Sequence, residues 1–382
     1  MHFYLKISVQ HKKHARKNWV IKDLSKGLGE VHRYARGHHD RVALEYIADD
    51  QLVAHPQEVV ALKIKDWAKR WVRQQGDQEA RRALDAAVRA HRDMDSDSRS
   101  VATAEGVGRA LRRTKGAAGL GGDWVGADTL KRCPDAAIEA LADQYSSWLR
   151  LGILPVQLMY NIIKLLCKKD GSDRPISLMP MTIRVLFKAL RGTTDEWLDG
   201  RQRHWDWAVR GSSALRAALA HKLMDELAAI EGMVRATWLW DVEKFYDSIR
   251  LHKLVDTALS YQYPADLLLL GLRCYLGPRM ITWKGVAGFW MAPNTSVCAG
   301  CVRANDMARV TMYDILDSMH VAHPRATLGQ FVDDCKASDE AKDDPAQWKR
   351  VDDMPIVRKM ASVCIDFREL CFQSGLTLAA DK

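Results

Sequence analysis

The stretch LGQFVDDCKAS, residues 328–338, places two adjacent carboxylates, Asp333 and Asp334, directly after an aromatic residue and a valine. The β-forming residues around the pair predict a tight β-hairpin with both aspartates at its turn. Neighbouring like charges repel and resist burial, so such a pair is usually left to solvent or bound to a cation. The pattern is short enough to arise by chance, and its meaning depends on other residues of the chain.

A further carboxylate, Asp241, stands at the end of a second predicted strand. Residues 234–240, VRATWLW, alternate as a strand does, and the helix predicted over 250–262 follows after EKFYDSI. A carboxylate at a strand end, with a helix leading away, is well placed to hold a metal ion. Together with Asp333 it predicts a site for two Mg²⁺ ions, which Mn²⁺ could replace. Two such ions, about 3.5–4 Å apart, support nucleotidyl transfer.

A cationic hairpin precedes these acidic residues. Residues 161–177, NIIKLLCKKDGSDRPIS, predict an apolar strand, a polar turn and a second short strand, and a helix is predicted from about Thr182. Lys168, Lys169 and Arg174 lie at or near the tip of this hairpin. Cations at such a tip can neutralise the phosphates of a nucleotide, and a solvated turn is the alternative.

The composition favours a globular protein with an acidic partner. The chain has 382 residues, 47% of them hydrophobic and 27% charged, which is enough for two or three subdomains with cores. The net charge of +9 indicates nucleic acid as the simplest partner. Residues 1–44 carry ten Lys and Arg against three acidic residues. This segment is either a phosphate-binding arm or a merely solvated terminus.

No apolar run reaches the length of a membrane span, and the basic N-terminus does not resemble a secretory signal. We therefore expect an intracellular protein without a membrane partner, in a compartment, nuclear or cytoplasmic, that the sequence does not distinguish. The eight cysteines are scattered, apart from Cys298 and Cys301, and no second pair completes a zinc site. They are predicted to be reduced thiols.

Two helical regions are predicted in the first half of the chain. Helical spacing covers 56–92 and ends in the polar run RDMDSDSRS, which predicts a linker and a boundary near residue 100. The second helix is predicted over 135–151, because Pro134 stands at its start and Gly152 just after its end.

The C-terminal third is predicted to contain one long helix over 294–319. Pro293 precedes it, and either Asn294 or Thr295 is the expected N-cap. After the acidic hairpin, the chain is expected to end on a helix and a short strand, GLTLAADK, at 375–382.

Six segments resemble, in order, the reverse transcriptases of the non-LTR retrotransposon and group II intron branch. The resemblance covers roughly residues 110–382, and ordered matches are more specific than any one of them. The six segments are TKGAAGLGGDW (114–124), CKKDGSDRPISLMPMTIRVLFKAL (167–190), AVRGSSALRAALAHKL (208–223), WDVEKFYDSI (240–249), FVDD (331–334) and GLTLAADK (375–382).

This resemblance implies an α+β fold with the fingers and palm subdomains of a right-hand polymerase. The fingers would cover 101–232 and the palm 233–382, with the thumb missing, and 1–100 would form a basic, mainly helical extension. The implied activity is DNA synthesis on an RNA template from a DNA primer and deoxynucleoside triphosphates, with Mg²⁺. Protein partners are not implied.

The resemblance also assigns roles to acidic residues. Asp241, Asp333 and Asp334 would be catalytic. Asp241 and Asp333 would ligate the metal ions, together with the backbone carbonyl of Val242.

Other roles concern the incoming nucleotide. Lys169 and Arg174 would meet the triphosphate, and Lys382 would stand where the family places a general acid for pyrophosphate. Tyr246 would pack under the sugar and exclude a 2′-hydroxyl, which indicates deoxynucleotides as substrates. Asp247 follows Tyr246 by one residue, which in a helix is a turn of about 100°, so its side chain should point away from the sugar.

One segment departs from the family pattern. The family carries a Gly-x-x-Gln-Gly element, whereas residues 284–301 read KGVAGFWMAPNTSVCAGC and lack the Gln, although Gly285, Gly288, Pro293 and Ser296 are similar. Two alternatives therefore stay open: a catalytically silent nucleic-acid-binding relic of a reverse transcriptase, and an RNA-dependent RNA polymerase.

Overall fold

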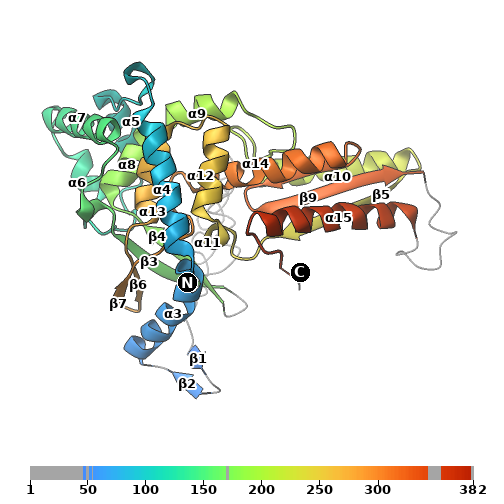
Figure 1. Ribbon diagram of the computed structural model, residues 1–382, viewed down its shortest axis with the longest axis horizontal. Coiled ribbons are helices and arrows are strands. Elements are labelled where there is room, and N and C mark those ends of the chain that lie inside the picture. The colour runs from blue at the N-terminus through green and yellow to red at the C-terminus, as the bar shows by residue number, and fades with distance from the viewer. Residues whose placement is uncertain (1–45, 49–50, 54, 169–171, 343–353, 380–382) are drawn as a thin grey trace, which may run out of the picture. The chain divides into compact units, whose positions relative to one another are not determined.

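The computed structural model describes residues 46–48, 51–53, 55–168, 172–342 and 354–379 (Figure 1). Helices make up 54% and strands 15%, which agrees with the predicted α+β class. The chain divides into two compact units, one of 1–53 with 167–172 and one of 54–166 with 173–382. The basic segment 1–44, Lys169 and Lys382 lie outside the described residues.

In the first unit, β1 (Tyr46–Ala48) pairs antiparallel with β2 (Gln51–Val53). The second unit begins with α3 (Pro56–Trp71) and α4 (Gly76–Arg92), which confirms the helical prediction for 56–92. A 3₁₀ turn at Ser96–Ser98 lies in the predicted linker.

The prediction for 135–151 is confirmed to the residue. Helix α7 (Asp135–Leu151) starts after Pro134, whose fixed φ suits a helix start, and ends on Gly152. Gly152 has a φ of 64°, a left-handed conformation that glycine adopts without steric cost. The helices around α7 and beyond it are α5 (Ala104–Arg113), α6 (Ala127–Lys131), α8 (Met181–Ala189), α9 (Arg191–Asp199), α10 (Ala214–Ile230), α11 (Phe245–Ser248), α12 (Leu251–Ser260), α13 (Ala265–Tyr275), α14 (Ala304–Ala322) and α15 (Pro355–Gln373), with a 3₁₀ turn at Val156–Leu158.

A four-stranded sheet contains the predicted cationic hairpin. Its order is β4-β3-β6-β7, so the two strands of the hairpin are neighbours, as expected. Helix α3 packs on this sheet, and Gly288 of β7 permits the contact, because a Cβ there would lie 2.3 Å from Ile64 of α3. The strands are β3 (Asn161–Cys167), β4 (Asp173–Leu178), β6 (Arg279–Trp283) and β7 (Val286–Met291).

A three-stranded antiparallel sheet carries the predicted acidic residues. Its strands β5 (Val234–Asp241), β9 (Asp334–Ala341) and β8 (Thr327–Phe331) are adjacent in that order, which confirms both predicted strands and the hairpin. Helix α15 lies along β5 and β9 (Figure 1). Trp240 of β5 stacks on Phe367 of α15 with ring centroids 4.0 Å apart, so this face of the sheet is buried.

The predicted helix over 294–319 is wrong in its first ten residues, because α14 begins at Ala304. Ser296 and Gly300 have φ values of 79° and 98°, which no right-handed helix allows. The Asn294 side chain accepts a hydrogen bond from the backbone N–H of Arg73 at 2.9 Å and donates one to its carbonyl at 3.0 Å. Asn294 therefore anchors a loop instead of capping a helix.

The described part of the predicted terminal strand, up to residue 379, forms a single bridge. One isolated antiparallel bridge joins Leu378 to Val242. Cys298 and Cys301 are buried, and neither forms a disulfide with another described cysteine.

Trp71, the last residue of α3, donates its indole N–H to the buried Oδ1 of Asp247 at 2.7 Å. Burial raises the pKa of Asp247, and the bond from Trp71 and the charge of Arg279 oppose that rise. The bond stabilises the ionised carboxylate of Asp247. Its contribution to the stability of the fold is therefore full above the folded-state pKa of Asp247 and is lost as the pH falls through that pKa.

Replacing the indole should therefore weaken the fold in a pH-dependent way. In Trp71→Phe the buried carboxylate loses a donor, and we expect a loss of about 1–3 kcal/mol in the free energy of unfolding at neutral pH that shrinks in acid. Urea unfolding at a series of pH values measures it. Trp67→Phe is the matched control, because Trp67 stacks on Trp71 at 5.1 Å and its loss should cost the same at every pH. Equal pH profiles for the two variants would contradict the assignment.

Candidate active site

The register of the three-stranded sheet places Asp241 of β5 directly across from Asp334 of β9. Residues opposite each other in an antiparallel pair share a face, and neighbours along a strand alternate. The preceding pair, Trp240 and Cys335, is buried on the side of α15. Asp241 and Asp334 therefore lie on the other face, where Asp241 is half-buried and Asp334 exposed.

At this pair the backbone of β5 is directed away from β9. The carbonyl of Asp241 accepts a bond from the N–H of Ala379 at 2.9 Å, on the edge of β5 away from β9. Asp241 and Asp334 thus form a non-hydrogen-bonded pair, in which Cα atoms are about 4.5 Å apart and side chains are closest. Like charges placed directly opposite each other destabilise a sheet unless another group offsets them.

Asp333 lies in the turn that joins β8 to β9, directly beside this pair. Asp333 is half-buried. Burial, and then the charge of Asp333, raise the pKa of the Tyr246 phenol well above its usual value, which indicates that Asp333 and Tyr246 are neighbours. The structure thus brings Asp241, Asp333 and Asp334 to one end of the sheet, with Tyr246 next to them.

Val242 follows Asp241 and is buried. Glu243 donates its N–H to the carbonyl of Thr377 at 2.8 Å, and this bond flanks the bridge between Val242 and Leu378. In an antiparallel pair such bonds alternate, so the N–H and carbonyl of Val242 point to the opposite edge, the edge on which β9 and its turn lie. The Val242 carbonyl is therefore directed toward the side of the carboxylates.

The turn itself is strained at Val332, whose φ is 63°. A two-residue hairpin turn with a positive φ at its first position normally carries glycine there, and a β-branched residue is an outlier. Such outliers persist where surrounding structure enforces them, and they concentrate at functional sites.

Relief of this strain should offset the loss of a side chain. We expect Val332→Gly to change the free energy of unfolding by less than about 1 kcal/mol, because strain of about 1–3 kcal/mol disappears while packing and backbone entropy are lost. Val242→Gly, the matched control at a buried position, should cost at least about 2 kcal/mol. Chemical denaturation of both variants checks this, and equal losses would contradict the strain at Val332.

Tyr246 and Asp247 point in different directions, as predicted. Lys244, with a φ of 47°, starts the short helix α11 after β5. The Tyr246 hydroxyl donates to Oδ1 of Asn305 in α14 at 2.9 Å, whereas Asp247 is buried against Trp71. Asp247 is thus directed into the core and away from the carboxylates.

The cationic hairpin is tied to the segment after β5. The Lys244 ammonium donates to the backbone carbonyl of Asp173, the first residue of β4, at 2.9 Å. Lys63 of α3 forms an ion pair with the Asp173 carboxylate. The side chain of the neighbouring Arg174 is exposed and makes no hydrogen bond or ion pair with another described residue.

Sequence reasoning missed two residues that shape this site. Lys244 lies in the same motif as Asp241, but nothing in that motif indicates the hydrogen bond from Lys244 to Asp173. Asn305, which holds Tyr246, fell inside a stretch predicted as uniform helix. Neither role could be predicted from local sequence, because Lys244 and Asn305 each bind a residue that is distant along the chain.

Among the described residues, no group of three or more His, Cys, Asp or Glu side chains is arranged to hold a metal ion. The donor set does fit Mg²⁺ in kind, because the two carboxylates Asp241 and Asp333 and the Val242 carbonyl supply hard oxygen atoms from adjacent segments. No helix in the described part of the chain has the length and apolar character to cross a membrane. Neither a protein-family model nor a curated protein sequence matches this chain.

Proposed function

We propose that this chain is an RNA-templated DNA polymerase that works by nucleotidyl transfer. The observation that supports it best is the register of β5 and β9, which sets Asp241 against Asp334 on the face away from α15, with Asp333 in the adjoining turn. Carboxylates gathered at one end of a sheet supply the hard oxygen ligands that divalent cations prefer, so the arrangement suits a catalytic use.

In the proposed site, Asp241, Asp333 and the Val242 carbonyl hold two Mg²⁺ ions. Bound there, the ions would activate a primer 3′-hydroxyl and stabilise the leaving pyrophosphate. The protein contributes position, because the buried contact of Trp240 with Phe367 holds β5 against α15, and β9 is paired with β5.

The substrate would be bound by groups on three segments. Arg174 at the start of β4 meets the triphosphate, since an exposed guanidinium group binds phosphate oxygens. Tyr246 lies beneath the sugar, with its ring oriented by the bond to Asn305. In this proposal β5, β8 and β9 belong to the palm, residues 101–232 form the fingers, and an RNA template and a DNA primer are the partners.

Addition of a single nucleotide tests the proposal directly, because one addition requires no translocation. The purified chain is mixed with a DNA primer annealed to an RNA template, one complementary deoxynucleoside triphosphate and Mg²⁺, and the primer is resolved on a gel. We expect addition of the complementary nucleotide and no addition of a mismatched one. Duplex binding without any addition, in Mg²⁺ or Mn²⁺, would instead support a nucleic-acid-binding relic.

A further inference from the structure

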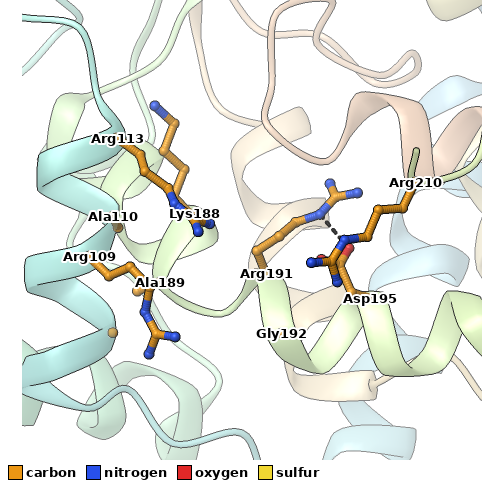
Figure 2. Close-up of a pocket in the computed structure, with 10 residues that line it drawn as sticks. Arg109, Ala110, Arg113, Lys188, Ala189, Arg191, Gly192, Asp195 and Arg210 are labelled. Carbon is orange, nitrogen blue, oxygen red and sulfur yellow. Dashed lines mark hydrogen bonds and ion pairs between the residues drawn. The ribbon is translucent and has the colours of Figure 1, made fainter. Parts of the chain in front are cut away.

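A cavity of about 430 Å³ lies between α5, the junction of α8 with α9, and the segment before α10 (Figure 2). None of its lining residues belongs to the candidate active site. A volume of this size is in the range of ligand pockets, about 300–1,000 Å³.

The lining is strongly cationic. Five basic side chains and one carboxylate border the cavity, and the other lining residues are small. In Figure 2, Arg109 and Arg113 extend from α5 on one side, near Lys188, while Arg191 and Arg210 lie on the other side beside Asp195. The small residues are Gly106, Ala110, Ala189 and Gly192.

The one lining carboxylate does not neutralise these charges. Asp195 accepts a hydrogen bond from Nε of Arg191 at 2.6 Å and is thereby engaged. Lys188 donates to the neutral hydroxyl of Thr114 at 2.9 Å. Burial lowers the pKa of Lys188, and the neighbouring charge of Arg184 lowers it further, as happens where positive charges are crowded.

The remaining arginines are available to a ligand. Arg109 forms only an exposed ion pair with Glu105 at 3.3 Å, of a kind that contributes little. The side chains of Arg113 and Arg210 are exposed and make no hydrogen bond or ion pair with other described residues. Three guanidinium groups thus face one cavity without a strong internal acceptor.

The chemistry of the lining selects phosphate. The planar fork of a guanidinium matches two phosphate oxygens, and several such groups around one cavity suit a multiply charged anion. Arg109 and Arg113 are four residues apart on α5, about 6 Å along the helix axis, so they can contact successive phosphates of one chain. No lining residue is aromatic, so a base would find no stacking surface.

We propose that this cavity binds two or more linked phosphate groups, supplied either by the backbone of a single-stranded nucleic acid or by a free polyphosphate. The site recognises the charge and spacing of the phosphates and makes no contact that distinguishes bases. Because it uses none of Asp241, Asp333 and Asp334, it does not depend on the proposed polymerase chemistry.

The sharpest test adds one negative charge to the cavity lining, at Gly192. A Cβ at Gly192 would meet no atom within 4 Å, and Gly192 lies in the first turn of α9, where an acidic residue is favourable. Gly192→Asp and Gly192→Asn have nearly the same shape and differ in charge. Affinities are measured by calorimetry, without metal ions or nucleotide, for an abasic deoxyribose-phosphate oligomer and for inorganic tripolyphosphate.

We expect Gly192→Asp to weaken binding at least tenfold relative to Gly192→Asn. Loss for both probes assigns the cavity to free polyphosphate as well as to a backbone, and loss for the oligomer alone assigns it to the backbone. Equal affinities of the two variants for both probes would overturn the proposal, whatever the outcome of nucleotide addition.

A second pair of variants removes charge from the rim. Arg113→Gln combined with Arg210→Gln should flatten the dependence of log affinity on log salt concentration by about 1.4, since each phosphate contact with a single strand contributes about 0.7. Arg81→Gln combined with Arg89→Gln, on the exposed face of α4, removes the same charge away from the cavity. An equal change of slope in both double variants would show that only net charge matters and would overturn the site.

Discussion

Asp241→Asn should lower the rate of single-nucleotide addition by at least roughly 10³-fold, and Asp333→Asn should do the same. An amide keeps the size of the carboxylate and the register of the strand, but it removes the charge that holds two divalent ions together. Because the amide keeps the shape of the side chain, the change should leave the free energy of unfolding within about 1 kcal/mol of the native value. Primer extension and urea unfolding of the same preparation separate the two effects.

The control is Asp85→Asn, on the exposed face of α4, which removes an equal charge and should leave addition unchanged. Asp334→Asn is informative as well, because Asp334 is the register partner of Asp241 while Asp333 lies in the turn. A smaller loss for Asp334→Asn than for Asp333→Asn fits the proposed ligands. Full activity in either Asp241→Asn or Asp333→Asn would exclude the two-metal site.

Much of the framework around these carboxylates was predictable because its signals are local. The strand before Asp241 alternates, and the turn at Asp333 is framed by β-formers, so short-range sterics determine both. Helix α7 has its boundary residues, Pro134 and Gly152, in the sequence itself. What remained to be found was the register that sets Asp241 against Asp334, since pairing between segments some ninety residues apart has no local signature.

Failures of prediction came from long-range contacts. The apolar run from Asn294 looked helical, but its first ten residues form a loop, because the Asn294 side chain is bound to the backbone of Arg73 more than two hundred residues earlier. The cationic cavity was missed for the same reason. Its charges come from segments up to a hundred residues apart, and each one alone resembles an ordinary solvated side chain.

The ring of Tyr246 is expected to decide which sugar is used. It is half-buried, it packs against Phe245 with centroids 5.6 Å apart, and its hydroxyl is bound to Asn305. A ring held in this way beside Asp333 leaves no room for a 2′-hydroxyl beneath the incoming nucleotide in the proposed site. A hydrogen-bonding acid could accept that hydroxyl, but Asp247 is committed to Trp71 in the core.

Tyr246→Val should therefore reduce the preference for deoxynucleotides over ribonucleotides at least about tenfold, because the exclusion is steric and a smaller side chain relieves it. Tyr246→Phe is the matched control: it loses the bond to Asn305 but keeps the ring, so its preference should stay near that of the native chain. The measured quantity is the ratio of the two kcat/KM values within one preparation, which cancels any loss of folded protein caused by removing a half-buried ring. A native chain that uses both sugars equally, or a ratio that does not move in Tyr246→Val, would leave nucleotidyl transfer standing on the carboxylates but would remove the argument that the product is DNA.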